Sequence, residues 1–140
     1  MNSVLETAER TVVSNDTYAD PLVRLQFITG PNMSGKSCYL TQIALLHIMS
    51  QIGSAILCEY ACIKIVDKLL TRIGNDDGLL AQISSFQAEM KGIAFVLDQL
   101  TDKSLVIVDE LGRGTSTTDA VSLKVAICEE LLQSKVNITD

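Results

Sequence analysis

The chain has 140 residues, of which 47% are hydrophobic and 20% charged, and its formal net charge at pH 7 is −6. This length and composition fit one globular domain with a buried core and exclude a disordered chain. The negative charge and the scattered Lys and Arg residues argue against a basic face that binds nucleic acid by itself. The chain shows neither a signal sequence nor an apolar run of roughly 20 residues, so we expect an intracellular chain without membrane contact.

The first predicted elements are a strand and a helix joined by a glycine loop. Residues 22–29 are short and partly β-branched or aromatic, which is typical of a strand running into a turn at Gly30. Residues 36–52 place apolar side chains at a period near 3.6, and Gly53 is suited to end a helix. We therefore expect a strand, a loop and a helix in this order.

The middle of the chain contains one clear helix pattern. Residues 55–58 fit a short strand, residues 63–73 mix periods and favour no element, and residues 74–78 have the composition of a turn. Ser84 opens a capping-box pattern that is followed by an apolar stripe. A helix over about residues 85–100 is predicted.

The last predicted elements are a strand, a polar loop and a helix. Residues 105–108 are uniformly apolar, as expected for a strand covered on both faces in a parallel sheet, and two acids follow at its carboxyl end. Residues 112–118 are polar, and residues 119–133 are periodic with an acid in the first turn. This alternation of strands and helices predicts an α/β fold with a mainly parallel sheet flanked by helices.

The cysteines and the single histidine suggest no site of their own. No Cys-x-x-Cys pair is present, so neither a disulfide framework nor a zinc site is indicated, and we expect reduced, mostly buried thiols. His47 ends an Ala-Leu-Leu run and is expected on a helix surface or in the core. The cysteines are Cys38, Cys58, Cys62 and Cys128.

Residues 30–37 fit the phosphate-binding pattern G-x-x-x-x-G-K-[ST], between a predicted strand and a predicted helix as the pattern requires. The glycines let backbone N–H groups curl toward a phosphate chain, and the helix adds its positive end. Lys36 is then expected to reach the β- and γ-phosphates of ATP, and Ser37 to bind Mg²⁺. The alternative is a Gly-Ser turn that happens to precede a helix. The expected nucleotide-binding residues are Gly30, Pro31, Asn32, Met33, Ser34, Gly35, Lys36 and Ser37.

Two adjacent acids follow the buried strand. Asp109 is suited to the Mg²⁺ shell through its carboxylate. Glu110, expected on the other side of the pleat, is suited to polarise an attacking water as a general base. Glu110 and Lys36 are therefore the expected catalytic residues. The alternative is that the two acids only cap the next loop.

Two other positions have open roles. Ser84 is either a helix N-cap worth about 1 kcal/mol or a hydroxyl that meets a phosphate, including one held by another subunit. Arg113 is a phosphate ligand, a partner-facing residue or a solvated loop charge, and spacing does not choose among these.

Three strings together resemble the ATPase domain of the MutS mismatch-repair family. They are residues 28–37 (ITGPNMSGKS), 84–90 (SSFQAEM) and 109–117 (DELGRGTST). The Pro-Asn-Met inside the loop and the Gly-Arg-Gly-Thr-Ser-Thr tail are more specific than the bare nucleotide motif. The resemblance covers about residues 4–135, and it looks strongest to the eukaryotic meiotic branch, that of the fourth MutS homologue.

The resemblance implies a P-loop NTPase of the ABC-ATPase type that works as a dimer. Each nucleotide would lie between the phosphate loop of one subunit and a signature segment of the other. Residues 30–37 would bind the phosphates and Mg²⁺, Asp109 the metal shell, Glu110 the hydrolytic water, and Ser84 the γ-phosphate held by the partner. The resemblance also implies a nuclear protein of mismatch repair or meiosis, in which ATP switches a DNA clamp. Its partner would be another MutS homologue, the fifth one in the meiotic branch.

The resemblance has limits at both ends of the chain. The family's domain continues into a Thr-His segment and a dimerisation region, whereas residues 133–140 diverge, and DNA would be bound by domains absent from this chain. We therefore expect residues 1–140 to be a partial C-terminal ATPase domain with a truncated sheet. The alternatives are a catalytically silent fragment that binds nucleotide or a partner, and a small-molecule kinase, for which no Arg-rich lid is visible.

Overall fold

A computed structural model of the protein describes residues 14–20, 22–73, 82–112, 117–133 and 137–139. Within these ranges the chain forms three helices and one four-stranded sheet. In chain order the elements are β1 (Leu25–Gln26), α1 (Lys36–Gln51), β2 (Leu69–Arg72), α2 (Gln82–Gln99), β3 (Leu105–Val108), α3 (Thr117–Gln133) and β4 (Asn137–Thr139).

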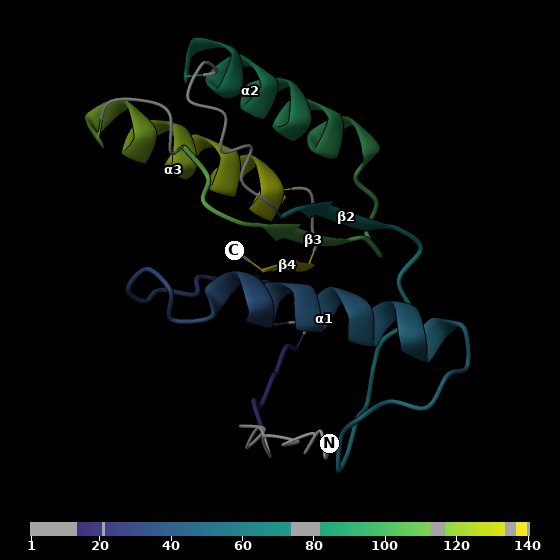
Figure 1. The fold of residues 1–140 in the computed structure, drawn as a ribbon. Helices are drawn as coiled ribbons and strands as arrows, with labels where there is room; N and C mark the ends of the chain where they lie inside the picture. The colour runs from purple at the N-terminus through teal and green to yellow at the C-terminus, as the bar shows by residue number, and fades with distance from the viewer. Residues whose placement is uncertain (1–13, 21, 74–81, 113–116, 134–136, 140) are drawn as a thin grey trace, which may run out of the picture.

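The sheet is parallel and lies between two helical layers. Its strand order is β1-β4-β3-β2, and every pair of neighbours is parallel. Figure 1 shows α1 on one face of the sheet and both α2 and α3 on the other. The expectation of an α/β fold with a parallel sheet flanked by helices is confirmed.

Strand β3 joins the two halves of the core. Its side chains alternate between the faces, as a strand requires. Leu105 and Ile107 belong to the cluster under α1, whereas Val106 and Val108 belong to the cluster under α2 and α3. All four side chains are buried, so the predicted strand covered on both faces is confirmed.

The helices follow the sequence closely, with one correction. Helix α1 starts at Lys36 as predicted and ends at Gln51, one residue earlier than predicted, and Gly53 follows it with φ 76°. Helix α3 begins two residues before the predicted start at residue 119. Helix α2 begins at Gln82 and not at residue 85, so Ser84 lies within its first turn. The interpretation of Ser84 as the N-cap is therefore wrong.

The strands differ more from expectation. Strand β1 contains only Leu25–Gln26, because the short β4 pairs with these two residues alone. Residues 55–58 form no strand, and β2 lies within residues 63–73, which favoured no element. Strand β4 occupies the tail that was expected only to diverge. The predicted turn at residues 74–78 lies outside the described ranges.

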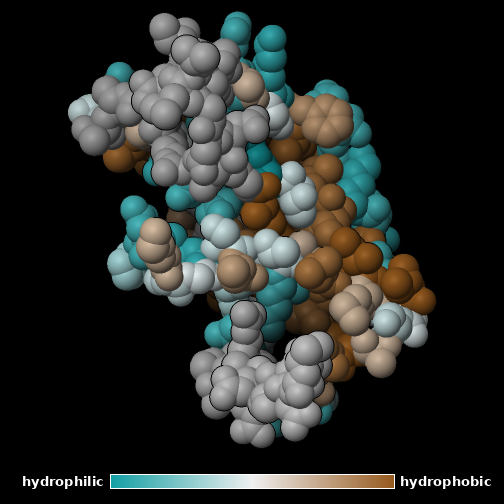
Figure 2. Space-filling model, viewed as in Figure 1, coloured by the Kyte–Doolittle hydropathy of each residue, from teal (hydrophilic) through white to brown (hydrophobic). Residues whose placement is uncertain are grey.

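Several of the most exposed apolar residues lie in the segment that follows α1. Leu57, Tyr60 and Ile65 follow that helix with large exposed fractions, and Figure 2 shows hydrophobic surface on this side of the molecule. No helix in the described part of the chain is long and apolar enough to cross a membrane.

The cysteines correct one expectation and the histidine confirms another. Cys38, Cys58 and Cys62 are exposed, so the expectation of mostly buried thiols is wrong, because α1 turns Cys38 outward and the segment after α1 packs little. His47 is half-buried within α1, and its Nδ1 lies 2.9 Å from the carbonyl oxygen of Ile43. It is a helix residue, as expected.

Candidate functional site

The glycine loop has the backbone shape that its sequence requires. Gly35 is the N-cap of α1 and adopts the left-handed conformation with φ 95°, which favours glycine. Within the loop, the N–H of Ser34 donates to the carbonyl of Pro31 at 3.3 Å. At Gly30 a Cβ atom would lie 2.9 Å from Oγ of Ser34, so a side chain at this position would require the Ser34 hydroxyl to move. Both pattern glycines therefore serve the curl of the loop.

Lys36 places its positive charge back over this loop. Its ammonium donates to the carbonyl oxygens of Gly30 at 2.8 Å and of Pro31 at 2.9 Å. Helix α1 has no acid in its first turn and no side-chain cap on its first N–H groups. The amino end of α1 therefore offers an anion the partial positive charge of its N–H groups and the full positive charge of the Lys36 ammonium.

A hollow of about 350 Å³ lies beside the loop. Asn15, which lines it, belongs to the segment before β1, and this segment makes three hydrogen bonds to α1. Asn15 Nδ2 donates to Gln42 Oε1 at 3.3 Å, and the hydroxyls of Thr17 and Tyr39 lie 2.8 Å apart. The hydroxyl of Tyr39 donates to the carbonyl of Asp16 at 3.3 Å. The hollow is lined by Asn15, Ile28, Thr29, Ser34, Gly35, Lys36, Cys38, Tyr39 and Gln42.

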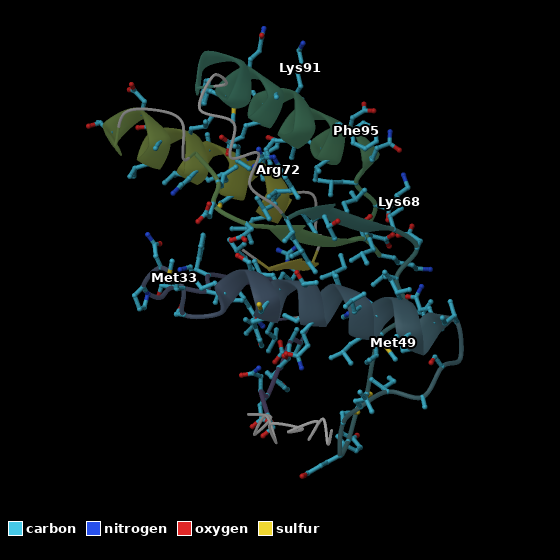
Figure 3. The ribbon with its side chains drawn as sticks, viewed as in Figure 1. Met33, Met49, Lys68, Arg72, Lys91 and Phe95 are labelled. Atoms are coloured by element: carbon cyan, nitrogen blue, oxygen red, sulfur yellow. The ribbon has the colours of Figure 1, made fainter. Side chains whose placement is uncertain are left out.

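The predicted loop residues do not all face this hollow. Ser34, Gly35 and Lys36 line it. Met33 stands at the tip of the loop with its side chain in solvent, as Figure 3 shows. Its φ is 63°. Ser37 lines an adjacent apolar groove along α1 of about 480 Å³. Of the remaining predicted residues, Gly30, Pro31 and Asn32 are exposed.

The segment leading into β1 carries its own charged turn. The carboxylate of Asp20 accepts the N–H groups of Leu22 and Val23 at 2.6 and 2.9 Å and the hydroxyl of Tyr18 at 2.9 Å. These bonds, that from Leu22 first, lower the pKa of Asp20, and the bond to Asp20 raises the pKa of Tyr18. Gln26 of β1 also donates to the Tyr18 carbonyl. The turn thus fixes the entry to β1.

The two predicted acids lie in a turn after β3. Asp109 is half-buried, and its N–H donates to the carbonyl of Arg72 at 2.9 Å. Glu110 is exposed with φ 53°, and it lies beyond the end of the strand at Val108. The expectation that it occupies the other side of the pleat is therefore wrong, because the pleat ends before it.

The sheet brings the loop and the acids to one edge. Strands β1 and β3 flank β4 and run parallel to it, so their carboxyl ends meet at the same edge, about 10 Å apart. The loop follows β1 there, and Asp109 follows β3. The hydroxyl of Ser37 and the carboxylate of Asp109 are oxygen ligands of the kind that Mg²⁺ prefers. Within the described ranges no cluster of three or more His, Cys, Asp or Glu side chains offers a competing metal site.

Sequence reasoning missed one residue next to the acids. Glu89 of α2 is 4% exposed, and its Oε1 accepts the N–H of Gly112 at 2.6 Å. The same oxygen lies 3.5 Å from Nη1 of Arg72 at the end of β2. A signal was present, because Glu89 lies four residues before the buried Ile93, on the apolar stripe of its helix.

Of the two positions with open roles, Ser84 loses the N-cap role and keeps only the phosphate-facing one as a hypothesis. Ser84 lies in the first turn of α2, near the amino end of that helix. Arg113 lies outside the described residues.

Residues 26–139 match the family model described as MutS domain V. The chain belongs to the MutS family. As a member, it is 50% identical over 123 residues to MutS protein homolog 4 of Mus musculus and 48% identical over 123 residues to that of Homo sapiens, which is 88% of this chain in each case. It is also 45% identical over 130 residues, or 93% of the chain, to the DNA mismatch repair protein MutS of Thermotoga maritima.

These comparisons confirm the predicted resemblance to MutS proteins and to the fourth homologue. The chain spans 13% of the length of the two mammalian relatives and 16% of that of the bacterial one. The activities of those whole proteins are therefore proposals for this chain.

Proposed function

We propose that this MutS-family chain is a P-loop NTPase of the ABC type that binds ATP through residues 30–37. The observation that carries the proposal is the position of Lys36, whose ammonium lies over the glycine loop at 2.8 Å from the carbonyl of Gly30. The left-handed Gly35 at the start of α1 and the hollow beside the loop support the same assignment. Phosphate oxygens would meet the N–H groups of the loop and the amino end of α1, and Lys36 would contact the β- and γ-phosphates.

We propose hydrolysis as the reaction. Bound Mg²⁺ would neutralise charge on the phosphates, held by the Ser37 hydroxyl and the Asp109 carboxylate. Glu110 would orient the attacking water and accept its proton at a carboxylate oxygen. Its exposure at the sheet edge supports this role, because a base must reach solvent water.

We propose that residues 1–140 form part of a C-terminal ATPase domain whose partner is a second MutS homologue. Ser84, at the amino end of α2, would face the γ-phosphate held by that partner. The net charge of −6 supports DNA contacts elsewhere in such an assembly and not on this chain. The setting would be nuclear DNA mismatch repair or meiotic recombination with ATP-driven switching of a DNA clamp, and the partner would be the fifth homologue in the meiotic case.

The test combines binding and turnover. Purified protein, with and without a partner homologue, is titrated with a fluorescent ATP analogue and assayed for phosphate release beside Glu110→Gln. We expect saturable binding by both forms and turnover by the wild type that falls about 100-fold in the variant. Equal turnover in both would remove the role of Glu110. Binding without turnover, even beside a partner, would favour a silent nucleotide-binding fragment.

A further inference from the structure

The turn that carries the two acids is fixed at both of its ends. At its start, the N–H of Asp109 donates to the carbonyl of Arg72 at 2.9 Å. At its finish, the N–H of Gly112 donates to the carboxylate of Glu89 at 2.6 Å. Glu110 lies between these two bonds. Since Arg72 also contacts Glu89 at 3.5 Å, the two anchors touch one another.

This turn needs the anchoring because its backbone is strained. Within the described ranges only Met33 and Glu110 are non-glycine residues with positive φ, and both lie in the candidate site. Such a conformation costs about 1–2 kcal/mol and persists only where neighbours impose it. Gly112 also has positive φ, and a Cβ there would lie 3.3 Å from Cε of Lys124, so the turn packs closely against α3.

Glu89 is placed to impose that conformation. It is buried on the same face of α2 as the core residues Ile93 and Val96, so the packing of the helix fixes its position. Its carboxylate meets a backbone N–H of a buried residue, and that N–H would lose its acceptor if the side chain were apolar. Arg72 supplies the compensating positive charge from β2, and Figure 3 shows it between α2 and the sheet.

We propose that Glu89 is a positioning residue for nucleotide turnover. Through the N–H of Gly112 it holds turn 109–112, and so sets where the carboxylates of Asp109 and Glu110 stand at the sheet edge. This inference rests on the proposed ATPase function. Glu89 touches neither nucleotide nor metal in this role, so its loss should lower turnover and leave nucleotide binding nearly unchanged.

The test uses the full-length protein and two substitutions that differ in one property. Glu89→Gln keeps an acceptor oxygen for the Gly112 N–H, whereas Glu89→Leu fills similar space without one. Glu129→Leu, at an exposed position of α3, is the matched control. The measurements are kcat, the Kd of an ATP analogue and the hydrogen-exchange rate of the Gly112 amide.

We expect Glu89→Leu to lower kcat about 100-fold, since misplacing a reacting group by about 1 Å has that cost, with Kd changed less than about threefold. The Gly112 amide should exchange at least about tenfold faster in that variant. Glu89→Gln and Glu129→Leu should keep kcat within about threefold of the wild type. If Glu89→Leu does not fold, Glu89→Met takes its place, because its flexible side chain adapts to the same space.

Two results would overturn the inference. One is a folded Leu or Met variant with wild-type kcat. The other is an equal fall of kcat in Glu89→Gln, which would assign the effect to charge and not to the bond with Gly112. A wild type that neither binds nor turns over ATP would overturn the proposed function itself. An active wild type with unaffected Glu89 variants would overturn this inference alone.

Discussion

The ammonium of Lys36 lies 2.8 Å from the carbonyl oxygen of Gly30, so the first residue of α1 contacts the first residue of the loop that precedes it. A single side chain thus bridges both ends of the glycine loop. This contact places the charge where a phosphate chain curled in the loop would run.

We expect Lys36→Met to weaken ATP binding about 10- to 100-fold, because hydrogen bonds to charged groups contribute about 1.5–3 kcal/mol. Titration with a fluorescent ATP analogue measures the change. Lys64→Met is the control, since Lys64 is an exposed lysine outside the loop and the hollow. Equal affinities in the wild type and Lys36→Met would contradict the assignment of the loop to phosphate.

Two glycines should respond in opposite directions to the same substitution. Gly35 has φ 95° and open space where a Cβ would stand, so Gly35→Ala should cost about 1–2 kcal/mol through backbone strain alone. Gly92 lies within α2, and a Cβ there would lie 3.6 Å from Nε of Arg72, an ordinary contact. Gly92→Ala should therefore stabilise by about 0.5–1 kcal/mol. Urea unfolding of both variants measures whether each change in stability has the expected sign. A Gly35→Ala variant that is more stable than the wild type would show that Gly35 does not adopt the left-handed conformation.

The core prediction concerns the strand that joins the two apolar clusters. Ile107 has an exposed fraction of 0%, so Ile107→Ala should lower the free energy of unfolding by about 2–5 kcal/mol. Val121 is 60% exposed on α3, and Val121→Ala should change the free energy of unfolding by less than about 0.5 kcal/mol. Denaturant titration separates the two, and similar losses would mean that β3 is not central to the core.

The stability of the turn before β1 should depend on pH. Hydrogen bonds from Leu22, Tyr18 and Val23 lower the pKa of Asp20 below its ordinary value of 3.8. The folded state therefore gains stability from this carboxylate above pH 3.8, and loses that gain as pH falls through the lowered pKa.

Asp20→Asn should remove this part of the pH dependence. The wild type should be more stable than the variant at pH 7, and the difference should shrink as the pH is lowered below 3.8. Thermal unfolding across pH 2 to 7 measures both chains. A constant difference over this range would show that the carboxylate is not bonded as described.

The helices and the central strand could be predicted because each carries a local signal. Residues 105–108 are apolar on both faces, and α1 repeats its apolar side chains between a glycine loop and Gly53. The start of α2 was placed too late, because the capping-box pattern at Ser84 occurs inside the helix that it was expected to begin.

The remaining strands and the buried Glu89 depend on contacts with residues that are distant in the sequence. Strand β2 is ordered by pairing with β3, from Leu69 with Leu105 to Arg72 with Val108, and its own residues show no clear period. Strand β4 is three residues long, and it is identified as a strand only by its pairing with β1 and β3 on either side. The burial of the Glu89 carboxylate is compensated by its contacts with Gly112 and Arg72, and neither residue is near it in sequence.

The pairing of β1 with β4 has a consequence for the order in which the molecule assembles. Leu25 pairs with Ile138, more than 100 residues later in the sequence, and among the described residues β4 is the only strand that β1 pairs with. Contacts of such long range form slowly, because the intervening loop must close first. During synthesis on the ribosome, β1 would emerge before β4 and could complete its pairing only after β4 has emerged.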